Sequence, residues 1–124
     1  MAITLDTGAL IALERRDRRM WDLLDDATDT GSVVTVPAAV VAEWWRGRSR
    51  GRAAILELFD VEPLDARLAM LTGEALATVP GATMVDALVM VSASLRGDVV
   101  YTSDVDDLVR LRDLRFPSTR VIRI

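Results

Sequence analysis

The sequence predicts a single α/β domain over residues 1–124, with a central, mostly parallel sheet of about five strands flanked by helices. Three observations support this fold class. A chain of 124 residues, 51% of them hydrophobic, can bury one independent core. Short β-branched runs alternate with longer segments whose apolar residues recur every three or four positions. This alternation is typical of parallel strands covered by helices on both faces.

The strand predictions rest on composition and on residues that interrupt strands. The run 32–36 is rich in β-branched residues, which favours a central strand. The run 61–64 contains Pro63, which cannot donate to a ladder and so favours an edge strand. Alternation over 119–124 predicts a final edge strand. In chain order, the expected strands are 2–6, 32–36, 61–64, 98–102 and 119–124.

The helix predictions rest on apolar spacing and on caps. Pro37 suits the first position of a helix. Asp65 and Thr83 can cap the helices that follow them, and either Ser103 or Asp104 can cap the last one. In chain order, the expected helices are 9–13 (closing in 14–16), about 18–27, 38–46, 53–59, 66–78, 84–95 and 105–114.

The composition restricts the chemistry available to the chain. All 15 basic residues are Arg, set against 14 Asp and 5 Glu, and there is no Cys, His, Lys, Asn or Gln. These absences exclude thiol nucleophiles, serine–histidine triads, Schiff-base lysines, thiolate or imidazole metal sites and lysine-dependent phosphate loops. An enzyme of this composition must use carboxylates, hydroxyls, Arg, backbone groups or a hard cation.

Nothing in the sequence indicates export or membrane insertion. The absence of Cys excludes disulfides, and residues 1–13 have no basic segment before their apolar stretch. No apolar run approaches the roughly 20 residues that span a bilayer. We therefore expect a cytoplasmic protein with no membrane partner. The net charge of −4 argues mildly against a nucleic-acid coat protein.

Three acidic residues, Asp6, Glu43 and Asp86, each stand alone in a long uncharged stretch. Asp6 ends the first strand, and Asp104 follows the strand 98–102. Sites in open parallel sheets form beyond the carboxyl ends of the strands. A buried carboxylate without a partner costs several kcal/mol, so these groups require Arg, backbone donors or a cation. Converging carboxylates without basic neighbours favour Mg²⁺ or Mn²⁺.

Each of these acids also has a purely structural interpretation. Asp6 could cap the following helix, and Glu43 could pair with Arg46. Asp86 is hardest to explain in this way, because Thr83 already offers the helix cap. The acids at the start of the last helix could simply stabilise that helix through a favourable interaction with its dipole; they are Asp104, Asp106 and Asp107.

Four short segments carry the isolated acids in a fixed order along the chain. They read Leu5-Asp6-Thr7-Gly8-Ala9, Ala42-Glu43-Trp44, Val85-Asp86-Ala87-Leu88 and Tyr101-Thr102-Ser103-Asp104. In this order they resemble the PIN-domain nucleases, and they look most like the VapC-type toxins of bacterial toxin–antitoxin pairs. The resemblance covers almost the whole chain and implies one PIN-like domain over residues 1–124.

The resemblance also implies roles for particular residues. Asp6 and Asp86 would be the best candidates for direct metal contact, and Asp107 would match an additional acidic position. Either Thr102 or Ser103 would match a hydroxyl that orients the first carboxylate. The family's acidic quartet around Mg²⁺ would be Asp6, Glu43, Asp86 and Asp104.

The implied function is that of a Mg²⁺-dependent endoribonuclease, with Mn²⁺ as a possible substitute, in which a metal-activated water hydrolyses RNA phosphodiester bonds. The implied partners are a cognate VapB-type antitoxin, an RNA substrate and a second copy in a homodimer. Two alternatives remain: a PIN nuclease of housekeeping RNA processing without an antitoxin, and a non-catalytic acidic interaction module. A receiver-like domain is disfavoured because its Lys is absent.

A group of arginines that follows Glu43 could hold an RNA backbone near the acidic centre, although a solvated surface is the alternative interpretation. The adjacent Trp44 and Trp45 differ in expected role: one belongs to the core, and the other could line a hydrophobic groove for a partner. The candidate RNA-binding residues are Arg46, Arg48, Arg50 and Arg52.

Overall fold

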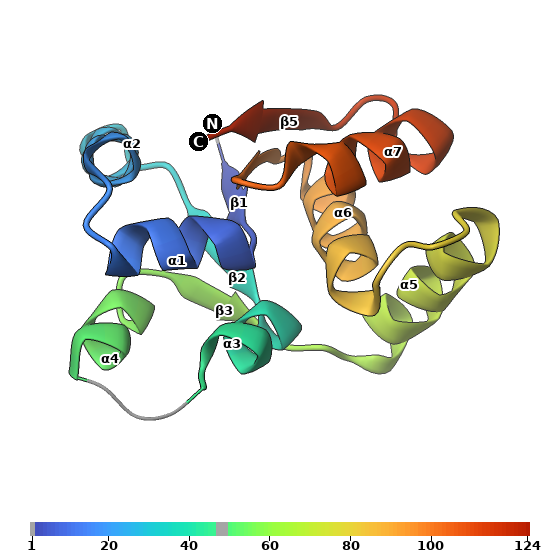
Figure 1. Cartoon of the computed structure of the whole chain (residues 1–124), viewed down its shortest axis with the longest axis horizontal. Helices are drawn as coiled ribbons and strands as arrows, with labels where there is room; N and C mark the ends of the chain where they lie inside the picture. Colours follow the sequence, from blue (N-terminus) through green and yellow to red (C-terminus); the bar gives the residue numbers. More distant parts are fainter. Residues whose placement is uncertain (1, 47–49) are drawn as a thin grey trace.

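The computed structural model describes residues 2–46 and 50–124, and its helices and strands lie within these ranges. Along the chain, one or two helices separate each strand from the next (Figure 1). The strands are β1 (Ile3–Leu5), β2 (Val34–Pro37), β3 (Asp60–Glu62), β4 (Val99–Thr102) and β5 (Arg120–Arg123). The helices are α1 (Thr7–Glu14), α2 (Arg18–Asp29), α3 (Ala38–Trp44), α4 (Arg50–Leu56), α5 (Ala66–Thr78), α6 (Met84–Arg96) and α7 (Val105–Arg115).

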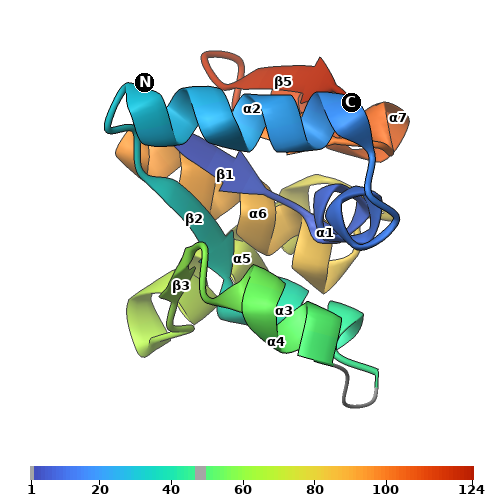
Figure 2. The ribbon, with the colours of Figure 1, turned by 90° about the vertical axis from the view of Figure 1, so that its left-hand side faces the viewer.

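The five strands form one sheet in the order β3-β2-β1-β4-β5, and every neighbouring pair is parallel. This confirms the predicted α/β class. Helices cover both faces of the sheet: Figure 2 shows α2 in front of it and α6 behind it. The chain leaves β1 toward β2 and leaves β4 toward β5, so the connections diverge beyond the carboxyl ends of β1 and β4. Such a point is where open parallel sheets place their sites.

The core is built around β1 and α6. Ile3 and Leu5 are buried, and α6 buries every residue from Ala87 to Ala93. A helix that is apolar on most sides fits this interior position, and α6 packs against β1, β2 and β4. Gly97, with a φ of 73°, provides the left-handed C-cap that ends α6 before β4. No helix within the described residues is both long and apolar enough to cross a membrane.

Several element ends differ from the predicted ones. Pro37 is predicted to open a helix, but it is the last residue of β2 and the N-cap of α3. Its fixed φ suits both positions, and its pairing with Glu62 of β3 holds it extended. The helix predicted over 53–59 begins earlier, at Arg50, and α4 includes Gly51. Further shifts include α1 at 7–14 rather than 9–13, α2, which continues to Asp29, β2 at 34–37 rather than 32–36, α3, which ends at Trp44, α4 at 50–56 rather than 53–59, and β3 at 60–62 rather than 61–64.

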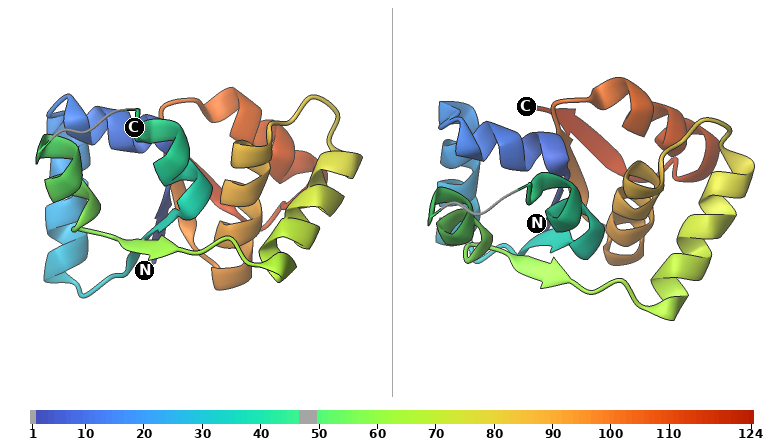
Figure 3. Two further views of the ribbon diagram at one scale, coloured as in Figure 1. Left: turned by 90° about the horizontal axis from the view of Figure 1, so that it is seen from below. Right: turned by 60° about the horizontal axis from the view of Figure 1, so that its bottom comes forward.

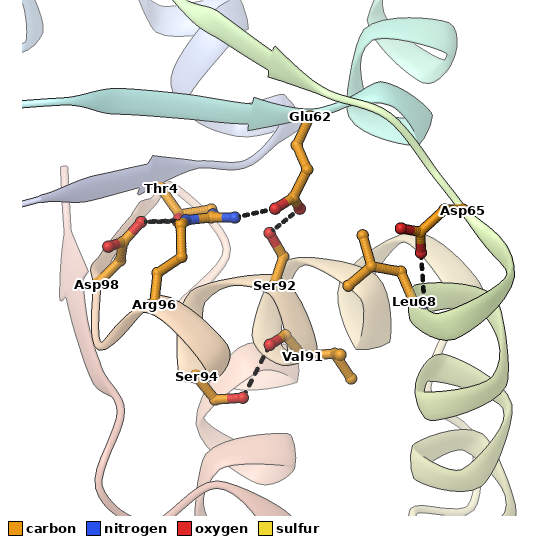
Figure 4. Close-up of polar contacts among 9 residues, drawn as sticks. All are labelled: Thr4, Glu62, Asp65, Leu68, Val91, Ser92, Ser94, Arg96 and Asp98. Carbon is orange, nitrogen blue, oxygen red and sulfur yellow. Dashed lines mark hydrogen bonds and ion pairs between the residues drawn. The ribbon is translucent and has the colours of Figure 1, made fainter.

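A polar network centred on Arg96 joins four segments of the fold (Figure 4). The Arg96 guanidinium donates to the carboxylate of Asp98 at 2.9 Å, to the hydroxyl of Thr4 at 2.9 Å and to the carboxylate of Glu62. Thr4 donates in turn to Asp98 at 2.8 Å, and Ser92 donates to Glu62. The network ties β1, β3 and the start of β4 to the C-terminal half of α6.

We expect Arg96→Met to lower the free energy of unfolding by about 3 kcal/mol, because it leaves the buried carboxylate of Asp98 without its cation. Urea denaturation measures this change. Arg112→Met is the matched control, since Arg112 pairs with the exposed neighbour Asp113, and such pairs contribute about 0–1 kcal/mol. Equal effects of the two substitutions would contradict the central role of Arg96.

Candidate acidic site at the carboxyl edge of the sheet

Asp6 lies directly after β1, and both of its carboxylate oxygens are engaged. One oxygen accepts the N–H of Ala9 at 3.0 Å, which makes Asp6 the N-cap of α1. The other accepts the hydroxyl of Thr102, the last residue of β4. Only 6% of Asp6 is exposed. The capping interpretation of Asp6 is therefore correct, and the cap fixes its carboxylate at the point where the connections diverge.

The hydroxyl that contacts Asp6 belongs to Thr102 rather than to Ser103. Thr102 is buried, and its hydroxyl also accepts the N–H of Asp104 at 2.9 Å. Ser103 instead lies against Gly8 of α1: a Cβ built at Gly8 would be 2.1 Å from the Ser103 hydroxyl. The close approach of α1 to the loop after β4 thus leaves little room for a Cβ at position 8 and favours glycine there.

Glu43 lies in α3, and its carboxylate accepts the hydroxyl of Thr7 at 2.6 Å. The predicted pairing with Arg46 takes another form, because the Arg46 guanidinium donates to the main-chain carbonyl of Glu43 at 3.1 Å. Sequence reasoning missed the contribution of Thr7. The available signal was its position immediately after Asp6, where the first turn of α1 faces the same edge of the sheet.

Asp86 lies in the first turn of α6 and is half-buried. Its main-chain N–H donates to the hydroxyl of Thr83, the helix cap, at 3.2 Å. The carboxylate of Asp86 is therefore not needed for the cap. Asp104 is the N-cap residue of α7, without a side-chain capping bond, and Asp107 lies in the first turn of the same helix.

Electrostatics link these acids. The pKa of Asp6 is raised from 3.8 to about 6, mainly by burial and to a smaller extent by the charges of Asp86 and Asp104. Hydrogen bonds from Thr102 and Ala9 act in the opposite direction, because they favour the ionised carboxylate. The Asp6 carboxylate is thus held in place by donors while its charge is disfavoured by its surroundings.

The pKa of Asp86 is also raised, first by burial and then by the charges of Asp107, Asp104 and Glu43. The hydrogen bond with Thr83 lowers it. The two raised pKa values together connect all five predicted acidic site residues, although the acids come from four different segments of the chain. No basic side chain is among the causes of either shift.

The described residues contain no group of three or more acidic side chains placed to hold one metal ion together. Mg²⁺ commonly uses one or two carboxylates and keeps several waters. A buried Asp6 and a half-buried Asp86, whose own pKa values are raised in part by the charges of neighbouring acids, fit that smaller requirement, since the donors are all oxygen. The predicted ligation by four carboxylates stays a prediction.

The candidate RNA-binding arginines follow α3. Arg46 and Arg52 line a cavity of about 450 Å³ next to Glu43. Arg50 begins α4, and its side chain, like the whole of Arg48, lies outside the described part of the chain. Trp44 is the core tryptophan, 3% exposed, while Trp45 is half-buried. The two rings meet edge to face with centroids 5.9 Å apart.

Comparison with known proteins identifies the family to which this chain belongs. The family profile described as PIN domain matches residues 3–114, so the chain belongs to the PIN-domain family. This confirms the family resemblance of the four acidic segments. A search of curated protein sequences gave no match.

The most similar solved structures include toxin–antitoxin complexes. VapBC2 from Rickettsia felis, bound to a promoter DNA fragment, has a TM-score of 0.80 at 14% identity over 100% of this chain and 99% of that one. DNA-bound VapBC from Salmonella typhimurium has a TM-score of 0.73 at 19% identity over 99% and 98%. VapC20 from Mycobacterium tuberculosis, a sarcin–ricin loop cleaving toxin, has a TM-score of 0.67 at 23% identity over 87% and 94%. At these identities the likeness establishes a shared fold.

We expect Asp6→Asn to stabilise the metal-free protein at neutral pH. Because the folded-state pKa of Asp6 is raised to about 6, the stability associated with this group is present below pH 3.8 and is lost as the pH rises through 6. Removing the charge should add about 1–2 kcal/mol to the free energy of unfolding above pH 6, since asparagine still caps a helix.

Urea denaturation in a chelator at several pH values measures this effect, with the exposed Asp25 changed to Asn as the control. The difference in the free energy of unfolding between Asp6→Asn and the wild type should become smaller as the pH falls toward 4. A gain that is independent of pH would contradict the raised pKa.

Proposed function

We propose that this protein is a Mg²⁺-dependent endoribonuclease, with Mn²⁺ as a substitute ion, and the toxin of a VapBC-type pair acting in the cytoplasm. The observation that carries the proposal is the buried Asp6, whose pKa is raised toward neutrality with Asp86 and Asp104 acting on it and no basic side chain offsetting them. An ionised carboxylate in this environment favours a cation. Membership of the PIN-domain family and the fold shared with VapBC toxins support the same function.

In this proposal Asp6 and Asp86 hold the ion, while Glu43, Asp104 and Asp107 complete its acidic surroundings through water or direct contact. Bound Mg²⁺ would lower the pKa of a water molecule and offset charge on the scissile phosphate. The carboxylates orient the ion and do not act as nucleophiles.

The hydroxyls at the site have a positioning role. Thr102 fixes the orientation of the Asp6 carboxylate, and Thr7 does the same for Glu43. Ser103 contributes the contact that brings the loop after β4 against α1. The chain has no His or Lys to activate the 2′-hydroxyl of RNA, so we propose water as the nucleophile, with 5′-phosphate and 3′-hydroxyl products.

We further propose a cognate VapB-type antitoxin and a homodimer as the protein partners. The support is the likeness to complexes of VapBC bound to DNA from Rickettsia felis and Salmonella typhimurium. Arg46 and Arg52, which stand beside Glu43, are the proposed contacts to the RNA backbone, together with Arg48 and Arg50.

We expect Asp86→Ala to reduce Mg²⁺-dependent RNA cleavage at least a hundredfold, because metal-assisted charge stabilisation contributes several kcal/mol to such a reaction. Cleavage of total bacterial RNA, with Mg²⁺ and with a chelator, measures the effect. Asp113→Ala, which removes an exposed acid of α7, should keep full activity.

Two further measurements make the test specific. Circular dichroism should show the same fold for both variants, and calorimetry with Mn²⁺ should show weaker binding to Asp86→Ala alone. Full metal-dependent activity in a folded Asp86→Ala preparation would overturn the proposed site, and a wild type that cleaves equally well in the chelator would overturn the metal dependence.

A further inference from the structure

A cavity of about 450 Å³ lies beside the acidic site, within the usual range for ligand pockets of about 300–1,000 Å³. Its lining comes from the ends of α1 and α3 and from α4, and α1 packs against both α3 and α4 (Figure 3). Thr7 and Glu43, joined by their 2.6 Å hydrogen bond, form the wall that it shares with the acidic site. A ligand in the cavity would therefore border the proposed cleavage centre.

The rest of the lining is rich in N–H donors. Arg15, Arg46 and Arg52 all line the cavity, and Arg15 and Arg46 are exposed to solvent. The contact seen for Arg46 is the donation of its Nε to the main chain of Glu43. A guanidinium carries five N–H groups, so one such contact leaves it able to bind a phosphate.

Trp44 makes a nucleobase an unsuitable occupant of this cavity. Its ring is 3% exposed, with Trp45 against it edge to face and the Arg52 guanidinium 6.0 Å from its centroid. No open aromatic face is thus presented for stacking. The buried indole N–H of Trp44 has no hydrogen-bond partner among the described residues. The charged and donating groups that the lining exposes are the guanidiniums of Arg15 and Arg46, which suit an anion.

We propose that this cavity binds a phosphate of the RNA strand that flanks the scissile phosphate, with Arg46 and Arg15 as its principal contacts. The inference rests on the proposed nuclease function and extends it with a second phosphate position. A guanidinium placed here attracts a strand that the neighbouring carboxylates repel.

A carboxylate within the cavity opposes this binding. Glu14 accepts from Arg52 at 2.6 Å, and the two side chains are 32% and 23% exposed. Glu14 thus competes with a phosphate for Arg52 and repels any anion that enters. Removing the charge of Glu14 should strengthen phosphate binding, whereas removing the charge of Arg46 should weaken it.

The opposite signs of these two effects form the test. The probe is a short, fluorescently labelled single-stranded RNA of mixed sequence, and its Kd is measured by anisotropy at several salt concentrations. Every variant is made in the Asp86→Ala background, so that the probe stays intact. Arg67→Gln is the control, because Arg67 is an exposed residue of α5 and does not line this cavity.

We expect Arg46→Gln to raise Kd about two- to fivefold, as for the loss of a surface charge pair. It should also reduce the slope of log K against log salt by about 0.7, the value for one phosphate contact on a single strand. Glu14→Gln should lower Kd by a similar factor, and Arg67→Gln should leave it unchanged.

The inference is overturned if Arg46→Gln changes Kd no more than Arg67→Gln does, or if Glu14→Gln raises Kd. It is also overturned if the Asp86→Ala protein without further substitutions does not bind the probe. Cleavage by the wild type is measured separately. If the wild type shows normal Mg²⁺-dependent cleavage but Arg46→Gln has no effect on the Kd for the probe, the second phosphate position alone is overturned. The opposed shifts in Kd without any cleavage would support the phosphate position and overturn the nuclease.

Discussion

The placement of the Asp6 carboxylate is the constraint on which the rest of the site depends. It caps α1 through Ala9 and accepts the hydroxyl of Thr102, so one side chain joins the central strand, the first helix and β4. Thr102 also fixes the N–H of Asp104. Burial, with a smaller effect of the charges of Asp86 and Asp104, raises the pKa of the same carboxylate to about 6. Its hydrogen bonds stabilise the fold, whereas its charge at neutral pH opposes folding until a cation is present.

The acids of the Arg96 network have a basic partner, whereas the acids of the candidate site do not have one among the groups that shift their pKa values. On the α6 side of the sheet, Arg96 forms ion pairs with both Glu62 and Asp98. At the carboxyl edge, the acids that raise the pKa values of Asp6 and Asp86 have no cation among the contributing groups. One of the 15 arginines, Arg96, thus provides a positive charge to both acids of its network. Leaving the acids of the candidate site uncompensated lowers stability, which is typical of functional sites.

The fold class was predictable because segments with the apolar spacing of strands alternate with segments that have the apolar spacing of helices. The predicted caps Asp65 and Thr83 mark helix starts that the structure confirms. Boundaries around α3 and α4 were less predictable, since Gly51 is tolerated inside a helix. The choice between Thr102 and Ser103 depended on which of two adjacent residues faces the interior, and that follows from the register of β4 on β1.

Long-range pairs lay outside what periodicity can predict. Thr7 and Glu43 are 36 residues apart, and Thr4 and Asp98 are 94 apart, so neither contact has a local signature. The local expectation for Glu43 was Arg46, three residues away. Thr7 provides the carboxylate contact instead, because α1 and α3 meet at the same edge of the sheet.

The net negative charge of the chain is compatible with an RNA substrate once the position of each charged residue in the structure is considered. Setting aside Asp6, Glu43, Asp86, Asp104 and Asp107 leaves 14 acids against 15 arginines. The remainder is nearly neutral overall but uneven, because arginines gather in the cavity next to the site while the acids of α2 lie elsewhere. Short distance matters more than net charge, since exposed charges are screened within about 10 Å. An acidic protein can therefore present a locally basic approach to an acidic centre.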